Sequence, residues 1–276
     1  MAAVGSYLSA RSRGGRWLLR MEDVDVPRCR QEHATTILRQ LEQLGMVWDG
    51  PVIWQSLRTD AYRTAIHQLA NQVYVCTCSR KALLAQAVPD DYPGICRERS
   101  LKPEGRYSLR LKVRDQEICF TDRRFGRQCL NLAKHGGDFV IRRADGYFAY
   151  QLAVVIDDAA SGVTEVVRGA DLLDSTFRQQ YLQSLLGYPA PDYLHLPLVV
   201  DQHGQKLSKQ QQAEPVNTLE PVVVLQQTLA RLGQPVNPDI DTLDDFWRWA
   251  QMHWDESRIP LCLPGAESSG QPVCAA

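Results

Sequence analysis

The sequence has no excess of charge of either sign and no long hydrophobic segment. Its 31 lysines and arginines almost balance its 32 aspartates and glutamates, which gives a formal net charge of -1. Overall charge therefore does not attract nucleic acid or an anionic membrane, and any polyanion has to be bound by a local patch. No stretch reaches the roughly 18 apolar residues of a membrane span, and the N-terminus lacks the apolar core of a signal peptide. These absences predict a cytoplasmic protein without a membrane association.

Internal repeats and the glycine-rich phosphate loop of P-loop enzymes are missing as well. The chain has 276 residues, of which 44% are hydrophobic and 23% are charged, as in an ordinary globular protein. Patterns typical of strands and helices alternate near both ends, with antiparallel hairpins between them. This order predicts an α/β fold, a doubly wound sheet interrupted by an insert. Further helices are expected near 219–232 and 242–254.

The eight cysteines are expected to be free thiols or metal ligands and not disulfides, because disulfides are rare in a reducing cytosol. Three of them, Cys76, Cys78 and Cys96, flank a loop that contains Tyr92. Zinc usually takes four ligands, so Tyr92, Asp90 or Asp91 would have to complete a site. Small buried side chains are the alternative, and spacing alone leaves both open. The other five are scattered and are interpreted as ordinary thiols: Cys29, Cys119, Cys129, Cys262 and Cys274.

Polar residues stand where predicted strands end or helices begin, which is where α/β proteins bind ligands. Glu22 closes the strand-like segment 16–25, together with Asp23 and Asp25. Arg168 closes another strand, and its planar fork suits a carboxylate or a phosphate. Tyr150 heads an apolar helix. Taken singly, each has a plainer interpretation: a solvated acidic loop, a surface arginine paired with a nearby aspartate, and a tyrosine whose hydroxyl is bonded locally.

Two lysines bracket a serine in "KLSKQ" (206–210), just after a glycine turn. Lys206 and Lys209 could stabilise the charge that develops on a departing pyrophosphate. They could equally be solvated surface residues.

In this order, the segments resemble the catalytic core of class I aminoacyl-tRNA synthetases of the glutamyl subgroup. "RMEDVDVPR" (20–28), "GYFAYQLAVVIDDAASGVTEVVRGADLLDST" (146–176) and "KLSKQ" are similar to three motifs of that subgroup, and "CTCSR" (76–80) to its zinc site. The resemblance runs from residue 1 to roughly 235. It is strongest to shorter members without anticodon-binding domains, which act on the queuosine base of tRNA(Asp).

The resemblance implies a domain organisation and a set of site residues. A Rossmann-like catalytic domain would comprise 1–75 and 138–215, with a zinc-containing α+β insert at 76–137, a helical segment at 216–258 and a disordered tail at 259–276. Glu22 would bind the amino group of glutamate, while Tyr150 and Arg168 would bind its carboxylates. The remaining implied roles are ATP-phosphate binding by Lys209 and Lys206, and structural zinc binding by Cys76, Cys78, Tyr92 and Cys96.

The implied reaction is a ligation in two steps by a monomer. Glutamate and ATP, with Mg²⁺, would give glutamyl-adenylate, and the glutamyl group would then pass to queuosine in tRNA(Asp). Two alternatives stay open, namely transfer to the 3′ end of a tRNA and a non-catalytic, zinc-containing RNA-binding protein. Eight basic residues are candidates for tRNA binding in each case: Arg97, Arg99, Lys102, Arg123, Arg124, Arg127, Arg142 and Arg143.

The sequence departs from the subgroup at its start. Members begin with a strand and a nucleotide-binding signature at the first helix, whereas this chain opens within that helix, at "AAVGSYLSARS". We therefore expect an N-terminal segment, with part of the ATP site, to be missing, and a gap in the sheet beside it.

Overall fold

The computed structural model describes residues 1–25, 29–79, 81, 83, 92–198 and 220–261. The α-helices are α1 (Ala2–Arg11), α2 (Gln31–Gln43), α3 (Thr59–Gln68), α5 (Tyr150–Ser161), α6 (Leu173–Leu186), α7 (Pro221–Arg231) and α8 (Leu243–His253). The strands are β1 (Arg20–Met21), β2 (Ile53–Trp54), β3 (Val73–Cys76), β4 (Ser108–Leu111), β5 (Glu117–Asp122), β6 (Gly126–Asn131), β7 (Phe139–Arg142), β8 (Glu165–Gly169) and β9 (Asp192–Leu196). Short 3-10 turns are η1 (Gln55–Arg58), η2 (Ala70–Gln72), η3 (Ala170–Leu172) and η6 (Glu256–Arg258).

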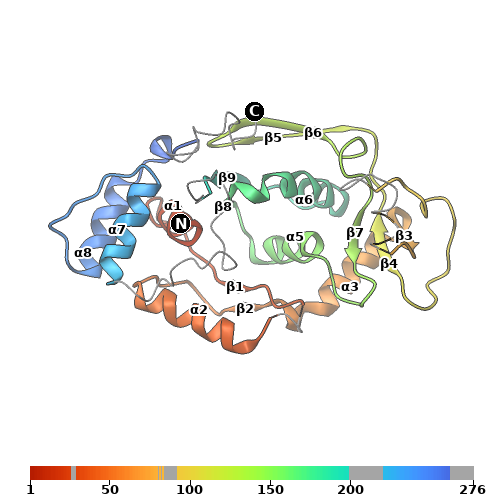
Figure 1. The fold of residues 1–276 in the computed structure, drawn as a ribbon, viewed down its shortest axis with the longest axis horizontal. Coiled ribbons are helices and arrows are strands. Elements are labelled where there is room, and N and C mark those ends of the chain that lie inside the picture. The colour runs from red at the N-terminus through yellow and green to blue at the C-terminus, as the bar shows by residue number, and fades with distance from the viewer. Residues whose placement is uncertain (26–28, 80, 82, 84–91, 199–219, 262–276) are drawn as a thin grey trace.

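The described strands form three sheets (Figure 1). β1 and β2 pair in parallel, and β3, β4 and β7 form an antiparallel sheet. The third sheet has the order β6-β5-β9-β8, in which β8 and β9 are parallel and β5–β6 is an antiparallel hairpin. β5 joins β9 in parallel at the pair Asp122–Tyr193. The predicted α/β class is confirmed, although these strands do not form one continuous doubly wound sheet.

Helices α5 and α6 lie at the centre of the molecule and carry the larger core (Figure 1). The apolar sequence of α5 buries Leu152, Ala153 and Val155 almost completely, as expected for a helix that is hydrophobic on most of its faces. α6 ends at Gly187, whose φ of 71° is the left-handed cap that glycine adopts without strain. The turn η3 leads directly into the start of this helix. Leu172 stands at the N-cap with no side-chain cap.

A second core joins α1, α7 and α8 to the inner face of β9. Leu8 of α1 packs there with Leu225 and Phe246, all fully buried. α1 approaches β9 closely at Gly5, where an added Cβ would lie 2.5 Å from Cδ1 of Leu196. The helix at the start of the chain is therefore part of the packed core.

A cluster of two arginines, two glutamates and a serine connects four segments beside this core. Glu165 of β8 contacts the guanidinium groups of Arg13 and Arg123, each at 2.7 Å. Glu256 of η6 contacts the same two groups at 2.9 and 3.2 Å. Ser9 of α1 lies within 2.8 Å of both carboxylates. These partly buried pairs hold α1, β8, the β5–β6 hairpin and η6 together.

Cys119 and Cys129 form a disulfide across the β5–β6 hairpin. They occupy directly opposed positions, with Cα atoms 4.2 Å apart, which is the close spacing of opposed residues in antiparallel strands. The prediction that no cysteines pair was wrong for these two. Their separation of ten residues did not reveal the register that brings them together. Among the described helices, none is long and apolar enough to cross a membrane.

Candidate active site

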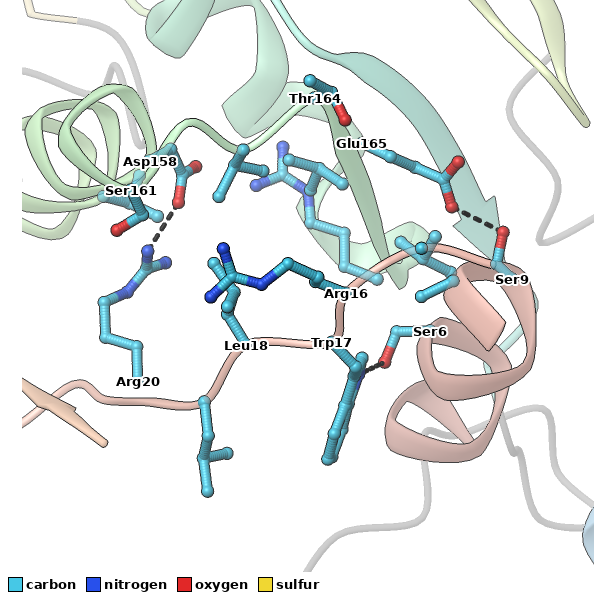
Figure 2. Close-up of a pocket in the computed structure, with 18 of the residues that line it drawn as sticks. Ser6, Ser9, Arg16, Trp17, Leu18, Arg20, Asp158, Ser161, Thr164 and Glu165 are labelled. Atoms are coloured by element: carbon cyan, nitrogen blue, oxygen red, sulfur yellow. Dashed lines mark hydrogen bonds and ion pairs between the residues drawn. The ribbon is translucent and has the colours of Figure 1, made fainter. Parts of the chain in front are cut away.

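A cavity of about 720 Å³ lies between the segment that leads into β1 and the strand β8 (Figure 2). α1 and α5 contribute to its walls, and Arg16 extends into it. Glu22, Tyr150 and Arg168 all line this cavity. The three residues that the sequence assigns to glutamate come from the end of β1, the start of α5 and the end of β8. The fold therefore brings them to one place.

Arg168 is a buried cation whose hydrogen bonds go to an imidazole ring and two hydroxyl groups. Its Nε lies 3.2 Å from Nε2 of His195, and its Nη2 lies 2.8 Å from the hydroxyl of Thr176. Its Nη1 lies 3.4 Å from the hydroxyl of Tyr150, and the guanidinium stands over the ring of Tyr193 at 5.5 Å. With only 9% of its surface exposed, it is not a solvated surface arginine. A buried cation of this kind favours an anionic ligand.

Behind Arg168 lie two fully buried residues that sequence reasoning missed. Asp122, at the end of β5, accepts a hydrogen bond of 2.7 Å from Nδ1 of His195 in β9. Burial acts to raise the pKa of Asp122, but hydrogen bonds from His195 and from two backbone N–H groups outweigh it and lower the pKa. The sequence shows only that one histidine, His195, lies within the apolar run of β9. It does not show which residues the ring contacts.

The ion pair of Arg20 and Asp158 also lines the cavity (Figure 2). Their closest atoms, Nη1 and Oδ1, are 2.5 Å apart, and Nη2 of Arg20 also reaches Oε1 of Glu22 at 3.2 Å. Burial raises the pKa of Asp158 despite the attraction of Arg20. The Glu22 side chain is 44% exposed, so its carboxylate remains accessible to a ligand ammonium group.

The two other carboxylates beside Glu22 have structural partners. Asp23 accepts hydrogen bonds from the backbone N–H and the hydroxyl of Ser56, at 2.9 and 2.6 Å, and so holds η1 against the end of β1. Asp25 pairs with Arg143 at 2.5 Å. These contacts favour a supporting role for both aspartates.

A buried carboxylate on α5 fixes the β1–β2 layer to that helix. Asp157 is fully buried and accepts from Nε2 of Gln55 at 2.8 Å and from the hydroxyl of Tyr62 at 2.7 Å. It also pairs with Nε of Arg58. Since Gln55 and Arg58 belong to η1, which directly follows β2, this network sets the position of Glu22 relative to Tyr150.

The three clustered cysteines and Tyr92 converge at the end of β3. Sγ of Cys78 lies 3.5 Å from Sγ of Cys96, and the Tyr92 hydroxyl lies 3.4 Å from Sγ of Cys76 and 4.0 Å from that of Cys78. Ligands on a tetrahedron with Zn–S bonds of about 2.3 Å are roughly 3.8 Å apart, so these donors fit zinc. The guanidinium of Arg110 stacks on the Tyr92 ring at 3.7 Å.

Burial and hydrogen bonding within this cluster shift the pKa values of Cys78 and Cys96 in opposite directions. Burial raises the pKa of Cys78 to about 11, with a further contribution from Cys96. Burial also acts on Cys96, but hydrogen bonds from the backbone of Thr77 and from its side-chain neighbours outweigh it and lower its pKa to about 7. A thiol that ionises near neutral pH is a ready metal ligand.

Six residues named from the sequence lie outside the described part of the chain: Lys206, Lys209, Asp90, Asp91, Cys262 and Cys274. Their predicted roles stay predictions. Several of the basic residues considered for tRNA binding are engaged in ion pairs, among them Arg97 with Asp138 and Arg143 with Asp25.

The family described as "tRNA synthetases class I (E and Q), catalytic domain" matches residues 1–233. The chain therefore belongs to this family of class I tRNA synthetases, and the resemblance seen in its motifs is confirmed. Individual relatives carry names that are more specific than the family description. The chain is 49% identical to a glutamyl-Q tRNA(Asp) synthetase of Aromatoleum aromaticum, over 98% of this chain and 89% of the relative. A protein of the same name from Chromobacterium violaceum is 47% identical, over 94% of this chain and 89% of the relative.

A solved structure shows the same fold. The glutamate-tRNA synthetase from Elizabethkingia anophelis superposes with a TM-score of 0.77 at 24% sequence identity, covering 94% of this chain and 62% of that one. At this identity the likeness shows the fold alone. It supports a class I catalytic fold built on the mixed sheets described above.

Proposed function

We propose that this chain is a ligase that activates glutamate with ATP and transfers the glutamyl group to the queuosine base of tRNA(Asp). The observation that carries the proposal is the match over 98% of the chain, at 49% identity, to a protein named for this activity. The geometry agrees with it, because Glu22, Tyr150 and Arg168 line one cavity that offers both an anion and a buried cation.

Glutamate would be bound by charge at both of its ends. Glu22 would receive the ammonium group, since its carboxylate is exposed toward the cavity. Tyr150 and Arg168 would bind the carboxylates. Glutamine would be rejected, because a neutral amide does not compensate a buried guanidinium.

In the first step, a carboxylate oxygen of glutamate attacks the α-phosphorus of ATP. A new P–O bond forms, the bond to the bridging oxygen breaks, and pyrophosphate leaves with the electron pair. Lys209 and Lys206 are proposed to stabilise the phosphate charge, together with Mg²⁺. In the second step, a hydroxyl oxygen of the cyclopentenediol of queuosine attacks the acyl carbon and forms an ester bond. The bond from the acyl carbon to the phosphate oxygen breaks, AMP leaves with the electron pair, and the hydroxyl proton passes to the phosphate or to water. Positioning of the reactants would supply much of the rate enhancement.

Zinc is proposed as a structural ion bound by Cys76, Cys78, Tyr92 and Cys96. It would add ligand bonds to a small satellite core that contains few large apolar side chains. No step of the reaction passes through it. We further propose that the zinc site belongs to an insert at 76–137 within a catalytic domain of 1–75 and 138–215, followed by a helical segment at 216–258, and that the chain acts as a cytoplasmic monomer.

The test measures both half-reactions with purified protein. Glutamate-dependent exchange of radioactive pyrophosphate into ATP reports the first, with glutamine as the control amino acid. Attachment of labelled glutamate to tRNA(Asp) reports the second, using otherwise identical tRNA with and without queuosine. We expect exchange with glutamate alone and labelling of the queuosine-containing tRNA alone. Absence of exchange would overturn the proposal, and equal labelling of both tRNAs would identify the 3′ end as the acceptor.

A further inference from the structure

The guanidinium of Arg168 donates a hydrogen bond to a ring nitrogen of His195. All five N–H groups of arginine are donors, so Nε2 of His195, 3.2 Å from Nε of Arg168, has to accept. An imidazole nitrogen accepts only when it carries no proton. The contact therefore requires the proton of a neutral His195 ring to sit on Nδ1.

Asp122 enforces this tautomer. Its Oδ2 accepts from the backbone N–H of His195 at 3.0 Å and faces Nδ1 at 2.7 Å. Its Oδ1 accepts from the N–H groups of Arg124 and Phe125, both at 2.9 Å. The carboxylate is thus surrounded by donors, and we assign the ring proton to Nδ1, where it points at Oδ2.

We propose that Asp122 and His195 are a positioning pair that sets the orientation of the Arg168 guanidinium for its ligand, an inference that rests on the proposed function. Neither residue is among those lining the cavity, whereas Arg168 is. His195 anchors Nε and Thr176 anchors Nη2. Nη1 reaches only a long contact of 3.4 Å with Tyr150, and so is the group best placed to exchange partners when a carboxylate binds.

The physical gain is preorganisation. A free arginine side chain loses considerable rotamer freedom when its fork is fixed. If packing and hydrogen bonds fix the fork before the ligand arrives, binding no longer carries that cost. The groups that accept from Arg168, which are the His195 ring and the Thr176 hydroxyl, are uncharged, and the negative charge of Asp122 lies on the far side of the imidazole ring. The guanidinium is therefore held without direct contact with a carboxylate.

The test compares two substitutions of the ring in the pyrophosphate-exchange assay. His195→Leu keeps an apolar side chain of moderate size and removes the acceptor, whereas His195→Gln can present an amide oxygen to Arg168. We expect His195→Leu to raise the KM for glutamate about tenfold or more, the loss expected for one hydrogen bond to a charged group. We expect His195→Gln to recover to within about threefold of the wild type. The KM for ATP should stay unchanged in both.

A double-substitution cycle separates positioning from general destabilisation. With Arg168→Lys as the background, the fork is absent, so His195→Leu should raise the KM for glutamate by no more than about twofold. Asp138→Asn is the matched control. Asp138 is also buried, and it accepts from Tyr74 and Arg97 far from the cavity. This change should lower the melting temperature and leave the KM for glutamate as it was.

Asp122→Asn provides an independent route if His195→Leu does not fold. An amide nitrogen in place of Oδ2 would move the ring proton to Nε2 and bring two donors face to face, so the KM for glutamate should again rise about tenfold or more. The inference is overturned if these variants change only the melting temperature, if the KM for ATP rises equally, or if His195→Leu has its full effect beside Arg168→Lys. Wild-type protein without glutamate-dependent exchange would instead overturn the proposed function.

Discussion

The buried network of Asp157 allows a stability prediction worked from individual contacts. The carboxylate is fully buried and receives three donors, with Gln55 and Tyr62 at Oδ2 and Arg58 at Oδ1. Asp157→Asn can keep its oxygen toward the first two donors and loses the charge-assisted contact with Arg58. Because the Arg58 side chain is 30% exposed, water replaces part of that contact. We expect the free energy of unfolding to fall by about 2 kcal/mol.

Asp157→Leu removes every acceptor. It leaves the Tyr62 hydroxyl and the Gln55 amide without partners in the interior, each at a cost of about 1–3 kcal/mol. Since breaking a buried pair costs about 3–5 kcal/mol, we expect a loss of about 4 kcal/mol. Asp60→Asn is the exposed control: its partner is Arg63, one helical turn away, and the change should stay within about 0.5 kcal/mol.

Urea unfolding followed by circular dichroism measures these differences at equilibrium. The reasoning is refuted if Asp157→Asn and Asp157→Leu destabilise equally, because the retained oxygen would then contribute nothing. It is also refuted if Asp157→Leu costs less than about 1 kcal/mol. The folded Asp157→Asn protein should in addition bind glutamate more weakly, since the network sets the distance between Glu22 and Tyr150.

Three further predictions test the site and its surroundings. Arg168→Lys should lower kcat/KM for glutamate in pyrophosphate exchange by about a hundredfold, because an ammonium group cannot keep the contacts with His195 and Thr176 and also present an N–H group to the ligand; an unchanged value would remove Arg168 from the glutamate site. Elemental analysis should find one zinc per chain in wild-type protein and in Cys29→Ser but none in Cys78→Ser, and full zinc content in Cys78→Ser would exclude that ligand. Acid should destabilise the protein through Asp122 and Glu165, whose pKa values are lowered against the effect of burial by His195 and by Arg123. Carboxyl groups of this kind stabilise the fold above their unfolded pKa of about 4, and that stability is lost as the pH falls through the lower folded pKa. Urea midpoints at pH 5 and pH 3 should therefore differ less in Asp122→Asn, and an equal difference would contradict the assignment.

Local sequence signals predicted the helices well and the strands less well. The helices expected near 219–232 and 242–254 are α7, which spans Pro221–Arg231, and α8, which spans Leu243–His253. Helices are defined by neighbouring residues, so their periodicity is visible in one segment. The strand expected over 16–25 pairs only at Arg20–Met21, because a strand exists only as far as its partner extends. That partner, β2, is itself two residues long.

In the candidate site, too, local signals indicated some residues, whereas residues that depend on long-range contacts were missed. The sequence indicated Glu22, Tyr150 and Arg168 as candidates because strand ends and helix starts mark ligand sites and because their motifs resemble a family, and the fold places all three at one cavity. Asp122, Asp158 and His195 were missed, since their importance depends on contacts between segments distant in sequence. The Cys119–Cys129 disulfide was missed for the same reason: it requires the register of β5 against β6.

The pairing of β5 with β9 limits where the chain can accept insertions and deletions. Asp122 marks the register of β5 against β9 and also holds His195. Inserting one residue within Glu117–Asp122 would turn alternate side chains to the other face and withdraw Asp122 from the ring. The turn of 123–125 belongs to the same arrangement, because the backbone N–H of Arg123 donates to the carbonyl of Tyr193 and those of Arg124 and Phe125 donate to Oδ1 of Asp122. Evolutionary insertions and deletions are therefore expected to be selected against from Glu117 to Phe125, although neither β5 nor this turn lines the cavity.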